Sequence, residues 1–263
     1  MNRRQSLGGG ARGFIPLKGI LNSSFTLAEV LITLGIIGIV AALTLPAIIQ
    51  NYQKMVIKNQ FKKSYSTLMN ALRMTEVAFG TQPMCYYGDD NVGRPCLEWE
   101  NGNCIKYGDA LNPTNRTEEC SVFKSELKKA LKVIKVCESN ALANGCIPPY
   151  KGKDTMYLEM NPDATEEDMN SFSNGVQSWR ESNIHTKCES WVLADGTIIL
   201  WYDKGPRLFG IDVNGMKKPN KWGYDIFAFE ITSHLGKSLW LSAYAMIEKG
   251  GVDAGAMLRD SYK

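Results

Sequence analysis

The chain has 263 residues, of which 44% are hydrophobic and 22% are charged, and its mean hydropathy is −0.21. These values exclude a polytopic membrane protein and a mainly disordered chain. The formal net charge is +3, but residues 1–24 hold four basic residues and no acidic one, so the remainder carries one excess negative charge. The positive charge therefore belongs to an N-terminal leader, and no nucleic-acid partner is expected.

The first predicted element is a membrane-spanning helix over residues 25–49. The segment reads FTLAEVLITLGIIGIVAALTLPAII and contains one charged residue, Glu29. A helix of this length rises about 37 Å, which is enough to cross a bilayer. The basic residues before it place the N-terminus in the cytoplasm and the residues after it outside. The apolar run is too long for an ordinary secretory signal peptide, so an uncleaved signal anchor is the remaining simple alternative.

Glu29 is the residue that a plain anchor does not explain. A carboxylate inside an apolar run costs roughly 2.5–3.5 kcal/mol on membrane insertion, so such a residue is a candidate for function. A free amine at residue 25, created by proteolysis before Phe25, would supply a partner cation for this carboxylate.

Residues 25–48 resemble the N-terminal segment of type IV pilins and type II secretion pseudopilins. In that family a prepilin peptidase removes a short basic leader and N-methylates the new N-terminal residue, usually Phe, and a Glu lies four residues further on. Phe25 and Glu29 have this spacing, and Gly38 and Pro46 match a Gly and a Pro of the family's helix. The resemblance implies cleavage between Ser24 and Phe25, although the family usually has Gly where Ser24 stands.

The resemblance, specific over about 25 residues, implies a structural subunit of a type II secretion or type IV pilus-type fibre. It implies a leader (1–24), a transmembrane helix (25–49), an amphipathic continuation (50–80) and an extracytoplasmic head (81–263). The expected partners are the prepilin peptidase, other pilin or pseudopilin subunits and the inner-membrane assembly platform. The expected location is the cell membrane in a single pass, and a cell-surface or periplasmic fibre after assembly. The rival hypothesis is a signal-anchored extracytoplasmic binding module that does not polymerise.

Beyond the span, apolar residues continue at steps of three to four residues and predict one helix from about residue 25 to 78. Pro46 is expected to kink or locally melt it, and Gly80 and Pro83 to end it. The apolar stripe consists of Ile57, Phe61, Tyr65, Leu68, Leu72 and Phe79.

Residues 82–116 are rich in Gly, Asn, Pro, Asp and Cys and predict a long, disulfide-tethered loop. Thr117 is then expected to cap a helix. Its apolar face would comprise Leu127, Ala130, Leu131 and Ile134, and Gly145 would close the helical region.

The strongest β signal is a hairpin over residues 191–202 with an Asp195-Gly196 turn. Residues 208–213 and 225–231 predict two further strands, and residues 239–263 are expected to be partly helical. The predicted fold class is α+β and pilin-like, with an antiparallel meander covered by the apolar stripe of the long helix.

The seven cysteines all follow the predicted span, on the side where disulfides persist. We expect Cys137 to pair with Cys146 across a short Gly-containing turn and Cys188 to remain a thiol. A continuous helix would hold Cys120 and Cys137 about 25 Å apart, which excludes a bond between them. Two bonds of open connectivity are expected among Cys85, Cys96, Cys104 and Cys120.

Two observations bear on chemistry. Asp212, Asn214 and Asp225 could supply oxygen ligands for Ca²⁺, and the alternative, which we favour, is an Asx-type turn between strands. The chain has two His residues and no recognisable nucleophile, metal or phosphate-binding motif. We therefore expect a structural protein and not an enzyme.

Overall fold

The computed structural model describes residues 26–80, 96–100, 103–107, 116–165, 167–168, 179–202, 208–232 and 238–262. The chain divides into two compact units, residues 1–50 and residues 51–263. The predicted leader, residues 1–24, lies outside the described residues.

Helix α1, Leu27–Phe79, is the longest element and begins and ends close to the predicted limits. It continues through Pro46 without interruption, so the predicted local melting is absent. Gly80 follows its last turn with a φ of +71°, a conformation that glycine adopts without strain, and its N–H bonds to the carbonyl of Glu76. Within the described residues, α1 is the one helix long and apolar enough to span a membrane.

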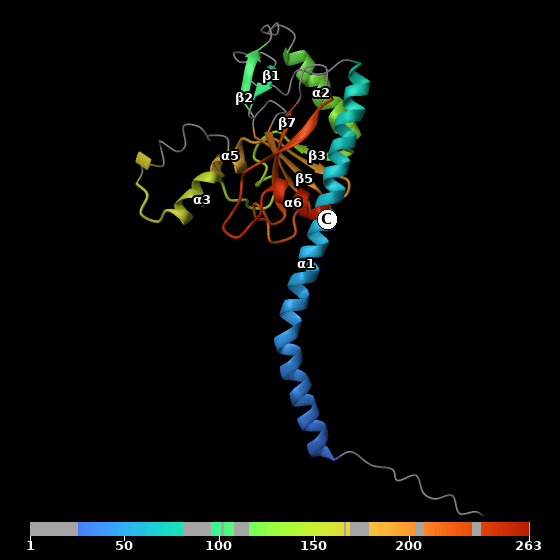
Figure 1. Ribbon diagram of the computed structural model, residues 1–263, viewed down its shortest axis with the longest axis vertical. Helices are drawn as coiled ribbons and strands as arrows, with labels where there is room; N and C mark the ends of the chain where they lie inside the picture. Colours follow the sequence, from blue (N-terminus) through green and yellow to red (C-terminus); the bar gives the residue numbers. More distant parts are fainter. Residues whose placement is uncertain are drawn as a thin grey trace, which may run out of the picture. The chain divides into compact units, whose positions relative to one another are not determined.

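The second unit is built on a six-stranded antiparallel sheet in which every strand pairs with its neighbour in sequence (Figure 1). The strands are β3 (Val133–Cys137), β4 (Ser190–Leu193), β5 (Ile198–Trp201), β6 (Leu208–Asp212), β7 (Ile226–Thr232) and β8 (Trp240–Tyr244). The α+β class, the hairpin with its Asp195-Gly196 turn and the antiparallel meander are thus confirmed. Strands β3 and β8 were not predicted and form the two edges of the sheet.

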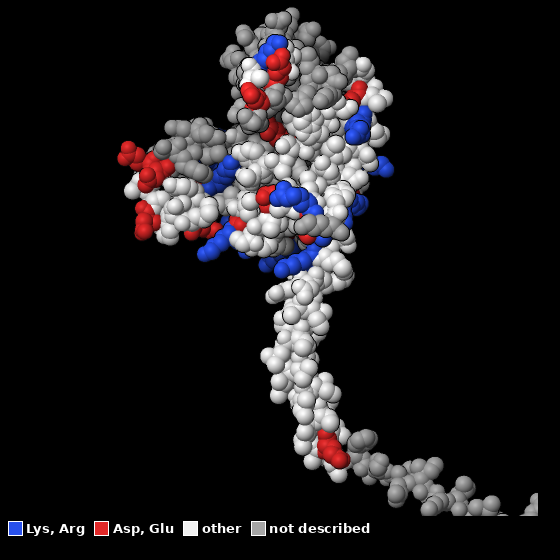
Figure 2. Space-filling model, in the orientation of Figure 1, with Lys and Arg blue, Asp and Glu red and all other residues white. Residues whose placement is uncertain are grey.

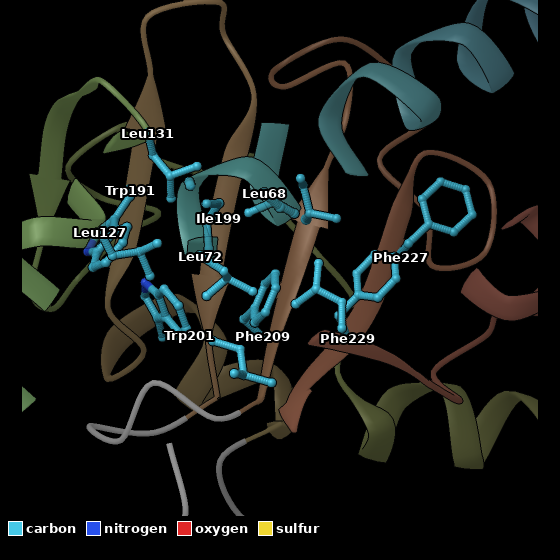
Figure 3. Packing of buried hydrophobic residues seen from close by; sticks show 14 of the residues in the cluster. Leu68, Leu72, Leu127, Leu131, Trp191, Ile199, Trp201, Phe209, Phe227 and Phe229 are labelled. Carbon is cyan, nitrogen blue, oxygen red and sulfur yellow. The ribbon is translucent and has the colours of Figure 1, made fainter. Parts of the chain in front are cut away.

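One face of the sheet is covered by residues 57–79 of α1 and by α2, Arg116–Ala130. Phe61 is 1% exposed, and its ring centroid lies 4.6 Å from that of Phe227 in β7. Leu68 and Leu72 of α1 and Leu127 of α2 point into the same cluster (Figure 3). The predicted role of the apolar stripe as the cover of the sheet is therefore confirmed for the second unit.

The opposite face of the sheet packs on a second cluster, which includes Trp179, Trp222 and Tyr150. The short helices of this unit are α3 (Lys153–Met160), α5 (Glu181–Thr186) and α6 (Ala254–Ser261). The tail after residue 239 holds both β8 and α6, so the expectation that it is partly helical is confirmed.

Two predictions for the middle of the chain are wrong. Helix α2 ends at Ala130, Lys132 has a φ of +54°, and the chain continues as strand β3 with the Ile134 side chain 68% exposed. Ile134 therefore does not belong to the apolar face of a helix, and Thr117 lies inside α2 instead of capping it. Cys120 and Cys137 therefore lie in different elements, α2 and β3, and not on one continuous helix.

The segment predicted as a loop contains a two-stranded antiparallel sheet. Its strands are β1, Cys96–Glu100, and β2, Asn103–Tyr107. A two-stranded hairpin buries little apolar surface, so it leaves no strong alternation in the sequence.

Candidate functional site

The N-terminus of α1 holds the predicted assembly residue Glu29 in a local hydrogen-bonded arrangement. The Glu29 Oε2 atom accepts hydrogen bonds from the backbone N–H and the hydroxyl of Thr26, both at 2.8 Å. The backbone N–H of Glu29 donates in return to the Thr26 hydroxyl at 3.2 Å. This is a capping box, in which Thr and a Glu three residues later satisfy each other's backbone donors. The T-x-x-E pattern of residues 26–29 is the sequence signal that indicates this capping box.

The capping box gives Glu29 a partner that does not depend on proteolysis. A carboxylate at the first turn of a helix is also favoured by the positive end of the helix dipole. Glu29 therefore has a local stabilising role, and any role in pairing with an amine would come in addition to it.

The other predicted processing and assembly residues are only partly described. Ser24 and Phe25 lie outside the described residues. Gly38 lies within α1, where a Cβ atom would meet nothing within 4 Å, and Pro46 lies inside the same helix. Exposed apolar side chains surround these positions on all sides of the helix.

The predicted calcium ligands lie together in the segment between β6 and β7. Asp212 is 1% exposed, and its Oδ1 atom accepts hydrogen bonds from the backbone N–H groups of Asn214, at 3.1 Å, and Gly215, at 2.8 Å. Its Oδ2 atom accepts one from the Tyr150 hydroxyl at 2.8 Å. Asp225 is fully buried and accepts from the backbone N–H groups of Asn220 and Lys221, at 2.8 and 2.7 Å.

Burial is the main cause that raises the pKa of Asp212 well above its ordinary value, and the nearby charge of Asp225 adds to it. Burial likewise raises the pKa of Asp225. Burial, with the Asp212 and Asp225 charges, also raises the pKa of Tyr150 well above its ordinary value. Folding therefore shifts each of these groups toward its protonated form relative to the unfolded chain.

These contacts match an Asx turn better than a calcium site. Ca²⁺ takes six to eight oxygen ligands, whereas every carboxylate oxygen of Asp212 and Asp225 already accepts a hydrogen bond from the protein. No group of three or more His, Cys, Asp or Glu side chains able to hold a metal occurs within the described part of the chain. Calcium binding by Asp212, Asn214 and Asp225 stays a prediction.

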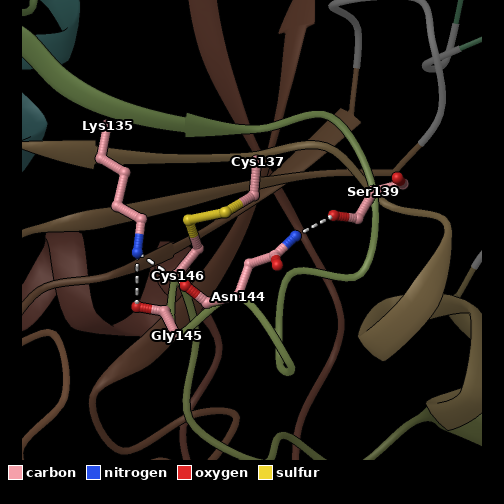
Figure 4. Close-up of a disulfide and its surroundings, with 6 residues drawn as sticks. All are labelled: Lys135, Cys137, Ser139, Asn144, Gly145 and Cys146. Atoms are coloured by element: carbon pink, nitrogen blue, oxygen red, sulfur yellow. Dashed lines mark hydrogen bonds between the residues drawn. A yellow bond between two sulfur atoms is a disulfide. The ribbon is translucent and has the colours of Figure 1, made fainter.

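The cysteines show one of the predicted bonds. Cys137 and Cys146 form a disulfide that ties the end of β3 to the following turn (Figure 4). The Lys135 ammonium holds the same turn by donating to the carbonyl of Asn144 at 2.6 Å. Cys188 is a buried thiol whose Sγ lies 3.8 Å from the carbonyl oxygen of Tyr202.

The remaining predicted cysteine bonds are not described. Cys85 lies outside the described residues. Cys96, Cys104 and Cys120 lie in β1, β2 and α2, but their side chains are outside the described part of the chain.

The comparisons with known proteins add no relative. No family model, curated protein or solved structure matches this chain.

Proposed function

We propose that the protein is a prepilin-like structural subunit of a type II secretion or type IV pilus-type fibre. A peptidase would cut between Ser24 and Phe25, and the subunit would then assemble through its N-terminal helix. The observation that carries the proposal is the first part of α1, residues 27–50, which is apolar on all sides, largely exposed and marked by one carboxylate near its start.

Two further features support this proposal. The same helix continues into the head and supplies the side chains that cover its sheet, so the apolar segment is joined to the head by continuous helix. The spacing of Phe25, Glu29, Gly38 and Pro46 resembles the pilin pattern. The partners in this proposal are the prepilin peptidase, other pilin or pseudopilin subunits and the inner-membrane assembly platform. In this role the head is structural and the protein is not an enzyme.

Intact-mass measurement of the protein extracted from membranes tests the processing step. The expected mass corresponds to the loss of residues 1–24 and the gain of one methyl group. Ser24→Gly restores the residue usual in the family and should be cut at the same bond at least as completely. Ser24→Trp places a bulky side chain beside the bond and should remain uncut. A native protein that retains residues 1–24 would contradict the proposal and favour the signal-anchored binding module.

A further inference from the structure

The connections of the six-stranded sheet fall at two ends, because neighbouring strands run in opposite directions. Two of them, the 194–197 turn and the 213–225 segment, lie at one end, here called the proximal end, and the 245–253 segment that follows β8 begins at the same end. Lys63 of α1 pairs with Asp195 at this end, with 2.8 Å between Nζ and Oδ2. Glu76, thirteen residues further along α1, accepts a hydrogen bond from the backbone N–H of Leu239 at the opposite end. The chain therefore leads back toward residue 50 from the proximal end.

The proximal end presents four exposed lysines, Lys217, Lys218, Lys221 and Lys249, here called the proximal lysine cluster. None of the ion pairs within the described part of the chain includes any of them. In the view of Figure 2, Lys and Arg side chains gather around the lower end of the head.

The two segments that carry the cluster are held together by hydrogen bonds. The Val252 N–H donates to the carbonyl of Gly223 at 2.8 Å, and the Tyr224 hydroxyl donates to the carbonyl of Lys249 at 3.0 Å. The Lys221 ammonium lies 5.8 Å from the centre of the Tyr224 ring. These contacts fix the backbone under the lysines, so less conformational entropy is lost when their side chains bind a partner.

The carboxylates at the proximal end are already engaged and do not neutralise the cluster. Asp195 pairs with Lys63, and Asp260 pairs with Lys58 at 2.9 Å. Asp253 accepts a hydrogen bond from the N–H of Ala256.

Three further carboxylates near the cluster, within the described part of the chain, are buried. Asp212 and Asp225 are the two carboxylates of the Asx turn. Glu248 is 6% exposed, accepts a hydrogen bond from the Trp222 N–H and lies 3.5 Å from the Lys151 ammonium. Among the described residues, no carboxylate pairs with these four ammonium groups, and their mutual repulsion is relieved by an anionic partner.

We propose that the proximal lysine cluster binds the anionic headgroups of the bilayer that the N-terminal helix enters. Lys58 is fixed to the head through Asp260 and lies eight positions after Gln50. A chain of that length spans at most about 29 Å, which limits the distance between Lys58 and the end of the apolar segment. Each lysine close to an anionic surface strengthens binding roughly fivefold, and the attraction fades over a Debye length of about 8–10 Å. This inference rests on the membrane anchoring in the proposed function, not on cleavage or fibre assembly.

Lysine labelling of the full chain in lipid nanodiscs tests this inference. The discs contain phosphatidylcholine alone or an equimolar mixture with phosphatidylglycerol, and mass spectrometry measures the acylation rate of each lysine. Labelling of the cluster should be at least about fivefold slower in the anionic discs, and high salt should remove the difference. Lys187, exposed at the opposite end of the sheet, is the internal control and should not change.

Two charge-matched double variants sharpen the experiment. Lys217→Gln with Lys218→Gln should weaken the protection of Lys221 and Lys249 in the anionic discs, because each lysine removed weakens binding roughly fivefold. Arg73→Gln with Lys187→Gln removes the same charge from exposed positions outside the cluster and should leave the protection intact.

Three outcomes would overturn the inference. Equal labelling in both kinds of disc would overturn the lipid-binding inference and leave the proposed function unaffected. Failure of the chain to enter discs would overturn the anchoring in the proposed function as well. A DNA duplex that protects the cluster in zwitterionic discs, where anionic lipid gives no protection, would assign the surface to nucleic acid instead.

Discussion

The two parts of α1 differ in the environment for which their sequences are built. Residues 27–50 carry apolar side chains on all sides, and they are largely exposed, whereas residues 57–79 bury one apolar stripe against the sheet. Ile37 is 62% exposed in the first part, and Phe61 is 1% exposed in the second. Backbone conformation is the same in both, so periodicity and not helix propensity separates a segment suited to lipid from one suited to a protein core.

The charged residues follow the same division. The first part holds one ionisable residue, Glu29, in a capping box at its start. The second part places lysines away from the buried stripe, where Lys58 and Lys63 pair with carboxylates of the head. The charge of the first part therefore stabilises the start of the helix, whereas lysines of the second part form ion pairs with the head.

The largest expected effect tests the comparison directly. Phe61→Ala should destabilise the head by about 3–5 kcal/mol, because it removes a buried ring and leaves a cavity against Phe227. Ile37→Ala should change the stability of the head by less than about 0.5 kcal/mol. Denaturant unfolding of the full chain in detergent, followed by tryptophan fluorescence, measures both. Similar losses for the two variants would show that the parts of α1 are not energetically distinct.

Glu29 provides the next test, because its two roles respond differently to substitution. In a packed fibre, its carboxylate would pair with the Phe25 amine of a neighbouring subunit, a pairing that is strong in apolar surroundings. Glu29→Ala and Glu29→Gln should therefore both insert into membranes at least as well as the native chain and be depleted from fibres. The measurement is co-fractionation with sheared or cross-linked assemblies, beside the amount in membranes.

Thr26→Ala is the matched control for Glu29, since it removes the hydroxyl of the capping box and keeps the carboxylate. It should assemble nearly normally, at a local cost of about 1 kcal/mol to the helix start. Normal incorporation of Glu29→Gln would refute the pairing role and leave Glu29 as a helix cap.

The smallest expected effect concerns a carboxylate of the head. Burial raises the pKa of Asp212, so the folded state holds a proton that the unfolded state releases. The stability from this proton is fully present below the unfolded pKa, near 3.9, and is lost as pH rises through the folded pKa. Asp212→Asn keeps an acceptor for the Gly215 N–H and avoids the charge. The variant should be as stable as the native protein in acid and more stable at neutral pH. Its Tm should then be higher by about 2–4 °C for each kcal/mol gained in the free energy of unfolding.

The same variant separates the Asx turn from a calcium site. If Ca²⁺ binds, millimolar Ca²⁺ raises the Tm of the native full chain above that in a chelator, and Asp212→Ala with Asp225→Ala abolishes the response. A native Tm that does not respond to Ca²⁺, together with a stabilised Asp212→Asn, would establish the turn.

Long periodic segments and tight turns were predictable from the sequence. The limits of α1, the 191–202 hairpin and the Cys137–Cys146 bond each follow from a local pattern whose physical cause is also local. The grouping of Asp212 with Asp225 was likewise predictable, because both flank the same β6–β7 connection.

The misses have a common cause, which is tertiary structure acting against a local pattern. Leu127, Leu131 and Ile134 follow helical spacing, but Lys132 adopts a left-handed conformation that its residue type does not indicate, and the chain turns into β3. Strand β8 is short, and its pairing with β7 places it in the sheet although its own pattern is ambiguous. The role of Tyr150 beside Asp212 depends on a contact between residues 62 positions apart.

The packing of Phe61 against Phe227 has a consequence for the order in which the chain matures. The sheet joins only strands that are consecutive in sequence, so its hairpins can form as each strand becomes available. The α1 stripe, by contrast, is synthesised early and finds its cover only in residues such as Phe227 and Phe229, far toward the C-terminus. Until β7 has been synthesised, the apolar stripe of α1 remains uncovered. Nascent chains with such uncovered apolar surface aggregate or require a chaperone.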